Sequence, residues 1–128
     1  MGRKYLLSAF SPKMVKNEAI WFIEIPVEDA IDIWNKMYEE PAEKEIVIGH
    51  QGTADLFREA GFKGVRGAER KPITLREGDE GIICMPSFRP PEGKVYTRRE
   101  MEELFKEGKI TCYKFKVLKP SEVGVWEW

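Results

Sequence analysis

The feature that most restricts the fold of this chain is a change of hydrophobic period at Val27. The segment 18–25, EAIWFIEI, is rich in β-branched and aromatic residues, which favours a β-strand. From there on the apolar residues recur at helical spacing and share one face: Val27, Ala30, Ile31, Trp34, Met37 and Tyr38. Glu28 and Asp29 then lie in the first turn, where the helix dipole favours acids. A strand that leads directly into an amphipathic helix indicates an α/β domain.

Strand-like and helix-like segments alternate along the rest of the chain. Further strands are predicted over residues 3–10, 71–76, 80–85 and 109–118, with a short apolar segment over 45–49. Further helices are predicted over 53–60, ended by Gly61, and from Thr97, ended by Gly108. Thr97 and Glu100 have the spacing of a capping box, and Glu77-Gly78-Asp79 favours a hairpin. The pattern predicts one α/β domain with a mixed sheet flanked by helices.

Length and cysteine content agree with one domain. A chain of 128 residues buries enough surface to form a core without cross-links. The cysteines, Cys84 and Cys112, lie in separate apolar segments, and the spacing of zinc ligands is absent. We therefore expect buried, reduced thiols, which favours a reducing cytosol. No apolar run approaches the ~18 residues of a membrane span and no signal peptide is evident, so we expect a cytoplasmic location.

The distribution of charge is uneven. The net charge is −1, which argues against a protein that coats duplex DNA through phosphate contacts. Residues 63–99 nevertheless carry a balance of +4, so the remainder carries −5. This segment is either a solvated charged face or a local site for an anion. Charged residues make up 34% of the chain, as in a heat-adapted protein, and that composition fits the first alternative.

The single histidine, His50, lies between the apolar segment 45–49 and the helix that follows. Gly49, Gly52 and Thr53 surround it, and free N–H groups at a helix N-terminus attract phosphate. A histidine at such a place can donate a proton to a leaving oxygen near neutral pH. Taken alone, however, a single histidine is more often a surface or loop residue without a chemical role.

Two other segments are candidates for a site. Residues 86–94, PSFRPPEGK, display Ser87, Arg89 and Glu92 on a stretch too rich in proline and glycine for a regular element. Residues 8–13, SAFSPK, are small and hydroxylated where a strand ends. The alternatives are an ordinary crossover loop and an ordinary turn.

Three segments in order, MGRKYLLSAFSPKM, IGHQGT and SFRPPEGK, resemble the viral ring nucleases that act as anti-CRISPR proteins. The similarity reaches the end of the last predicted strand, which gives a domain over 1–118 and a C-terminal extension over 119–128. That family degrades cyclic tetra-adenylate, the second messenger of type III CRISPR defence. The resemblance implies an α/β domain that forms a homodimer and binds the ring across its two-fold axis.

The resemblance also implies roles by position. His50 corresponds to a catalytic histidine that protonates the departing 5′-oxygen. Glu92 corresponds to a glutamate that assists at the 2′-hydroxyl or the leaving group, and Arg89 to an arginine that holds the scissile phosphate. Arg70 corresponds to an arginine that contacts a phosphate or a base. The implied pocket residues are Ser8, Ala9, Ser11, Gly52, Thr53 and Ser87.

This sequence departs from the family pattern in several places. Ser8 and Lys13 stand where asparagines are usual, Gly52 replaces a serine, and Met85 replaces a glutamine. The two prolines at 90–91 replace more flexible residues and should stiffen the loop. The phosphate contacts implied by the resemblance are therefore retained more completely than the adenine contacts.

We predict a ring nuclease that needs no metal or other cofactor and whose partners are cyclic tetra-adenylate and a second copy of itself. Attack by the substrate's own 2′-hydroxyl would yield linear di-adenylate with a 2′,3′-cyclic phosphate. One alternative is a module of the same fold that sequesters the cyclic nucleotide uncut. Another is a structural or regulatory protein that uses a dimer surface and Trp126 and Trp128. Both a virus that defeats immunity and a cell that resets its own signal fit this reading.

Overall fold

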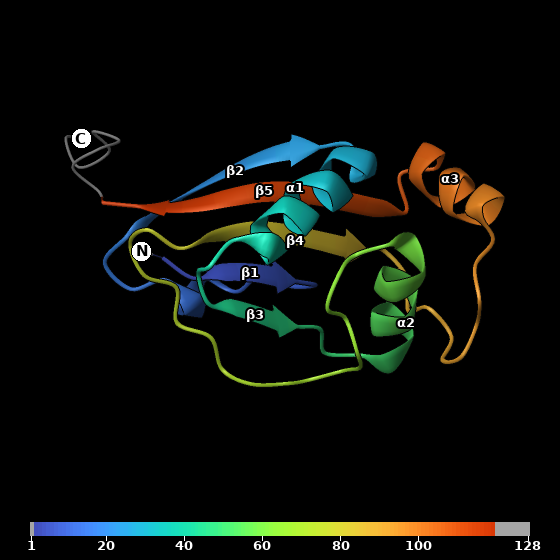
Figure 1. Cartoon of the computed structure of the whole chain (residues 1–128), viewed down its shortest axis with the longest axis horizontal. Coiled ribbons are helices and arrows are strands. Elements are labelled where there is room, and N and C mark those ends of the chain that lie inside the picture. The colour runs from blue at the N-terminus through green and yellow to red at the C-terminus, as the bar shows by residue number, and fades with distance from the viewer. Residues whose placement is uncertain (1, 120–128) are drawn as a thin grey trace.

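The computed structural model describes residues 2–119, apart from the side chain of Arg98, and contains a five-stranded sheet (Figure 1). In spatial order the strands are β2 (Ala19–Ile25), β5 (Ile110–Leu118), β4 (Glu80–Pro86), β1 (Lys4–Leu7) and β3 (Lys44–Val47). β1 pairs in parallel with β3 and β4, whereas β5 is antiparallel to β4 and β2. The predicted α/β class with a mixed sheet is confirmed. The carboxyl ends of β1, β3 and β4 meet at one edge.

Helices supply the core on one face of this sheet. They are α1 (Val27–Glu39), α2 (Gln51–Ala60) and α3 (Arg98–Lys106). The predicted apolar stripe of α1 faces inward: Val27, Ala30, Trp34 and Met37 are buried, and the Trp34 indole donates to the Lys63 carbonyl at 2.9 Å. No helix among residues 2–119 combines the length and apolar composition that crossing a membrane requires.

The ends of the two shorter helices follow local sequence signals. Gly61 terminates α2 with a φ of 103°, a left-handed conformation that glycine adopts without strain. Thr97 begins α3 with the predicted capping box, because its hydroxyl accepts from the Glu100 amide while the Glu100 carboxylate accepts from the Thr97 amide. Helix α2 begins at Gln51, two residues before the predicted start, so His50 becomes its N-cap.

The other face of the sheet is covered by chain without strand or α-helix. Phe10 and Met14, from the segment after β1, pack there together with Ile73 and Leu75. Leu75 is fully buried, and its amide donates to the Met14 carbonyl at 2.7 Å. The prediction of a strand over 71–76 is therefore wrong: its alternating apolar residues face the sheet from outside.

The predicted hairpin across Glu77-Gly78-Asp79 is wrong for the same reason. These residues do turn the chain, and the Asp79 amide donates to the Arg76 carbonyl at 2.9 Å. The strand that follows, however, pairs with β1 and β5 rather than with the preceding segment.

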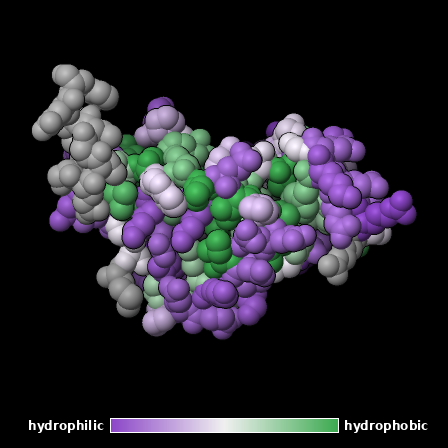
Figure 2. Space-filling view, turned by 90° about the horizontal axis from the view of Figure 1, so that it is seen from above, coloured by the Kyte–Doolittle hydropathy of each residue, from purple (hydrophilic) through white to green (hydrophobic). Residues whose placement is uncertain are grey.

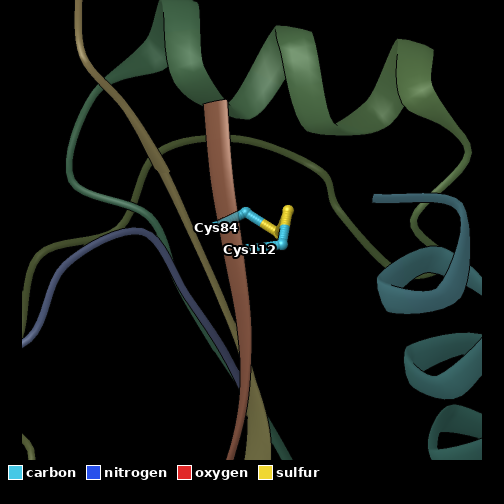
Figure 3. Close-up of a disulfide and its surroundings, with 2 residues drawn as sticks. All are labelled: Cys84 and Cys112. Carbon is cyan, nitrogen blue, oxygen red and sulfur yellow. A yellow bond between two sulfur atoms is a disulfide. The ribbon is translucent and has the colours of Figure 1, made fainter. Parts of the chain in front are cut away.

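The two cysteines form a disulfide between β4 and β5 (Figure 3). The antiparallel register places Cys84 opposite Cys112, with Cα atoms 4.1 Å apart, and both side chains are buried on the helical face. The expectation of reduced thiols is wrong, and the argument from them to a reducing cytosol no longer applies. Strand register brings the thiols together, and their spacing in the sequence does not reveal it.

One edge of the sheet exposes apolar side chains. Trp21, Phe22 and Ile23 of β2 are 39–46% exposed. Figure 2, seen from the side of β2, shows apolar side chains along this edge between strongly hydrophilic regions. Among residues 2–119, β2 pairs with β5 alone, so its other side is an unpaired edge of the sheet. The C-terminal tryptophans, Trp126 and Trp128, lie outside the described residues.

Candidate active site

A cavity of about 450 Å³ opens at the edge of the sheet where β1, β3 and β4 end. It is lined by Ser8, Ala9, Gly49, His50, Thr53, Pro86, Ser87, Phe88 and Arg89. In open α/β sheets, ligands bind in the crevice beyond the carboxyl ends of parallel strands. The three segments selected from the sequence thus meet at one place, although long stretches of chain separate them.

His50 occupies the N-cap position of α2 in an extended conformation, and its side chain makes no capping hydrogen bond. The imidazole lies instead between two arginines. Its Nδ1 is 3.2 Å from Nη2 of Arg70, and its Nε2 is 3.5 Å from Nη2 of Arg89. Both arginines belong to the positively charged segment 63–99, so part of that charge surrounds one ring.

Arg70 is held in place by backbone groups. Its Nε donates to the Gly49 carbonyl at 2.8 Å, and the neighbouring Glu69 amide donates to the Ile48 carbonyl at 2.9 Å. Arg70 is not among the residues that line the cavity. It contacts His50 from outside that lining. Its contact with the imidazole therefore orients the ring.

The two arginine contacts cannot both be hydrogen bonds to neutral His50. A guanidinium has only N–H donors, and a neutral imidazole has one donor and one acceptor nitrogen. The shorter distance assigns the acceptor to Nδ1, facing Arg70, and the ring hydrogen to Nε2, beside Arg89. Two donors then lie side by side on the cavity wall, an arrangement suited to an oxygen atom of an anion.

The loop that carries Arg89 rests directly on the first turn of α2. A Cβ atom added to Gly52 would lie 1.7 Å from the Pro90 carbonyl oxygen, so only glycine permits this approach. Gly52 and Pro90 are both buried. Gly52 therefore supports the loop and is not among the residues that line the cavity. The glycine at 52 and the prolines at 90–91 lie in contact with each other. Both depart from the pattern of the ring nucleases that the sequence resembles.

Asp55 is a buried residue of the site region that the sequence analysis missed. Its carboxylate accepts from the Gly93 amide at 2.8 Å, from Gln51 Nε2 at 2.9 Å and from Arg58 Nη2 at 2.8 Å. The Gly93 hydrogen bond above all, and then the Gln51 one, hold the pKa of Asp55 below its usual range. The available signal was an acidic residue beside the apolar residues Leu56 and Phe57 of a predicted helix.

Besides Gly52 and Arg70, two further predicted site residues lie outside the cavity lining. Glu92 is exposed on the loop, between the proline pair and Gly93. Ser11 is the N-cap of a short 3-10 helix (Pro12–Met14), where its hydroxyl accepts from the Lys13 amide at 3.3 Å. The remaining predictions for the pocket, Ser8, Ala9, Thr53 and Ser87, are brought together with His50 and Arg89.

A second cavity, of about 640 Å³, lies at the opposite end of the sheet, where β1, β3 and β4 begin. Arg3, Glu45 and Lys71 contribute to its wall, where Arg3 and Lys71 are each paired with Glu45. The single histidine lies at the other edge, so the larger volume does not mark the more reactive place. Residues 2–119 contain no group of three or more His, Cys, Asp or Glu placed to hold a metal ion.

Comparison with known proteins assigns the chain to a family. Residues 4–115 match the family model described as STIV B116-like. The uncharacterized protein ORF116 of Acidianus filamentous virus 1 (isolate United States/Yellowstone) is 30% identical over 115 residues, which are 88% of this chain and 94% of that protein. The structure of B116 of Sulfolobus turreted icosahedral virus is similar with a TM-score of 0.80 at 29% identity, covering 90% of this chain and 99% of that chain. The chain therefore belongs to the STIV B116-like family, whose members include these proteins of archaeal viruses.

Proposed function

We propose that this protein is a ring nuclease that cleaves cyclic tetra-adenylate without a metal ion. The observation that supports this best is the convergence of the His50 Nε2 and the Arg89 guanidinium on one cavity wall. A phosphate bound there would accept from Arg89 and lie beside a potential proton donor. The resemblance of three segments to viral ring nucleases supplies the substrate class.

In the proposed reaction, a ribose 2′-hydroxyl gives up its proton to a base, either the Glu92 carboxylate or water, and attacks the adjacent phosphorus. The O2′–P bond forms and the P–O5′ bond breaks, which leaves a 2′,3′-cyclic phosphate and a 5′-hydroxyl. As the general acid in this step, His50 carries a hydrogen on each ring nitrogen, so Nδ1 no longer accepts from Arg70, and the Nε2 proton passes to O5′. Glu92, on the same loop as Arg89, assists at the 2′-hydroxyl or the leaving oxygen.

The rate enhancements that such groups usually supply are consistent with this reaction. The attack is intramolecular, so orientation alone supplies much of the acceleration. A positioned acid adds ~10²–10⁴-fold, and the guanidinium stabilises charge that develops on the phosphate oxygens. None of these contributions requires a metal ion.

The cavity is small for the proposed substrate. Its volume of about 450 Å³ accommodates part of a ring of four nucleotides. We therefore propose that two copies of the chain bind one ring across a two-fold axis, which places one His50 on each side. The reaction would end type III CRISPR signalling in the cytoplasm of an infected cell.

The decisive experiment incubates the pure protein with cyclic tri-, tetra- and hexa-adenylate in excess EDTA and identifies the products by mass spectrometry. We expect cyclic tetra-adenylate to give linear tetra-adenylate and then di-adenylate, both with 2′,3′-cyclic phosphate ends. A product with a 3′-hydroxyl and a 5′-phosphate, or loss of activity on chelation, would contradict the mechanism.

Sequestration without cleavage is the second candidate, and one observation favours it. Glu92 is exposed and is not among the residues that line the cavity, so His50 is the only acid–base side chain among the described lining residues. A binding module would show tight association with cyclic tetra-adenylate and no product in the same incubation.

A further inference from the structure

A polar cluster behind the N-terminus of α2 connects the two arginine-bearing segments of the site. At its centre is Asp55, which is 5% exposed. One carboxylate oxygen, Oδ1, accepts from the side chains of Gln51 and Arg58, and the other, Oδ2, accepts from the Gly93 amide. A buried carboxylate is costly unless it is fully hydrogen-bonded, and this one has donors at both oxygens.

Each partner of Asp55 leads to a segment that bears an arginine. Gly93 belongs to the loop 86–94, which presents Arg89 to the cavity. Gln51 also accepts, through Oε1, from the Ala68 amide at 3.1 Å, and Arg58 donates to the Arg66 carbonyl at 3.2 Å. Ala68 and Arg66 precede Arg70 in the chain.

We propose that Asp55 is a positioning residue, which holds the loop of Arg89 and the segment of Arg70 against α2, the helix whose N-cap is His50. The two guanidinium groups then keep their places at the two nitrogens of the imidazole. The catalytic part of this inference rests on the proposed ring nuclease function, whereas the positional part does not.

The substitution Asp55→Asn tests this role because it preserves shape and removes half of the acceptors. If the amide oxygen of Asn faces Gln51 and Arg58, the amide nitrogen meets the Gly93 N–H, and two donors oppose each other. In the flipped orientation, Gly93 is satisfied and the other two donors are not. Either the loop or the side-chain pair therefore loses its anchor. Glu59→Gln, on an exposed residue of the same helix, makes the same change of charge and is the control.

The first measurement does not depend on catalysis. Amide hydrogen exchange is followed by NMR, and inorganic phosphate is titrated while the His50 ring resonances are recorded. In Asp55→Asn we expect exchange at Gly93 or Ala68 to accelerate roughly tenfold, as for a locally opened segment. Phosphate should bind roughly tenfold more weakly, since a displaced guanidinium loses its charge-assisted hydrogen bonds. Glu59→Gln should match the wild type in both.

The second measurement is the single-turnover rate with saturating protein and cyclic tetra-adenylate, well below the thermal midpoint of each variant. A positioning role predicts a fall on the order of 10²-fold in Asp55→Asn, because small displacements of catalytic groups are that costly. A merely structural role would lower the thermal midpoint and leave the rate of the folded protein unchanged.

The outcomes separate this inference from the proposed function. Unchanged exchange at both amides, or wild-type cleavage by Asp55→Asn, overturns the positioning role. If the wild type cleaves no ring, the proposed function fails and the phosphate titration decides: weaker binding in the variant supports positioning, and equal or absent binding overturns it. If Asp55→Asn does not fold, Gln51→Met replaces it. That variant should speed exchange at Ala68 and leave Gly93 protected, and wild-type values at both would contradict the proposal.

Discussion

His50 is placed for chemistry by two neighbours that the sequence separates from it. Arg70 orients Nδ1, and Arg89 lies beside Nε2 on the wall of the cavity. In the proposed reaction the ring transfers a proton only as the P–O5′ bond breaks. Its removal should therefore affect the transition state far more than the bound ground state.

The substitution His50→Ala should slow single-turnover cleavage of cyclic tetra-adenylate by roughly two to four decades, the usual contribution of a positioned acid. Binding of the ring, measured by calorimetry at low temperature, should remain close to that of the wild type. Arg89→Ala provides the contrast, because a phosphate contact made in both states should weaken binding and rate together. A near wild-type rate for His50→Ala would exclude His50 as the acid.

Individual residues of the site could be predicted unequally well. His50, Arg89, Ser87 and the residues after β1 stood out because small, hydroxylated or charged side chains follow predicted strands, and such positions meet at one sheet edge. Asp55 could not be identified in this way, since its partners are the amide of a distant loop and side chains whose positions depend on tertiary structure. The sequence shows residue types, but it does not show which buried acceptor meets which backbone donor.

At the scale of elements, the contact between the first turn of α2 and the loop 86–94 is the tightest part of the site. A methyl group at position 52 would meet backbone atoms of Pro90 and Pro91, at 1.7–3.1 Å, rather than flexible side-chain ends. The helix or the loop would have to move. The close packing of this loop against the helix therefore depends on the absence of a side chain at position 52.

The substitution Gly52→Ala should destabilise the fold by about 1–3 kcal/mol, as overpacking commonly does. The gain in helix propensity is at most about 1 kcal/mol, so the steric cost should prevail. Urea unfolding measures the difference. Gly49→Ala is the control for stability, because its added Cβ would lie 3.7 Å from Arg70 Nε, in ordinary contact. A Gly52→Ala protein as stable as the wild type would show that the loop yields freely.

The anchor of the same loop should also be sensitive to acid. The Gly93 amide, followed by Gln51, lowers the pKa of Asp55 in the folded state. A carboxylate with a lowered folded pKa stabilises the protein above its unfolded pKa, and that stabilisation is lost as pH falls through the folded value. Below about pH 4 the free energy of unfolding of the wild type should therefore fall more steeply than that of Asp55→Asn. Parallel curves from urea unfolding at stepped pH would contradict this assignment.

The element predictions succeeded where local signals decide and failed where pairing decides. Gly61 and the Thr97–Glu100 capping box act through neighbouring backbone, so they set the helix ends correctly. Segment 71–76 alternates like a strand, but alternation shows only that one side is buried and not that the backbone pairs. The cysteine pair failed similarly, since register between β4 and β5 is a property of the assembled sheet.

For the whole molecule, the proposed two-fold assembly predicts how mixed dimers behave. Two related phosphates of one ring would each face a His50, so a dimer with a single His50→Ala subunit should cut only one of them. Linear tetra-adenylate should then accumulate in single-turnover reactions, whereas the wild-type dimer proceeds to di-adenylate. The measurement uses differently tagged subunits, purified as the mixed species and compared with both parent dimers by mass spectrometry.

Calorimetry tests the two-fold arrangement separately, and it should give one ring bound per two chains. If mixed and wild-type dimers give the same ratio of linear tetra-adenylate to di-adenylate, one subunit makes both cuts. A stoichiometry of one ring per chain would remove the two-fold arrangement while leaving the chemistry of a single site open to the tests above.

The order of strands in the sheet has a consequence for biosynthesis. Strand β2 leaves the ribosome well before β5, the only strand with which it pairs among the described residues. Until β5 emerges, Trp21, Phe22 and Ile23 have no neighbouring strand on either side. Strands so distant in sequence pair slowly because a long loop must close first. The nascent chain therefore carries an unpaired apolar strand segment until β5 has been translated. Its yield in a cell should depend on chaperones that shield this segment until β5 emerges.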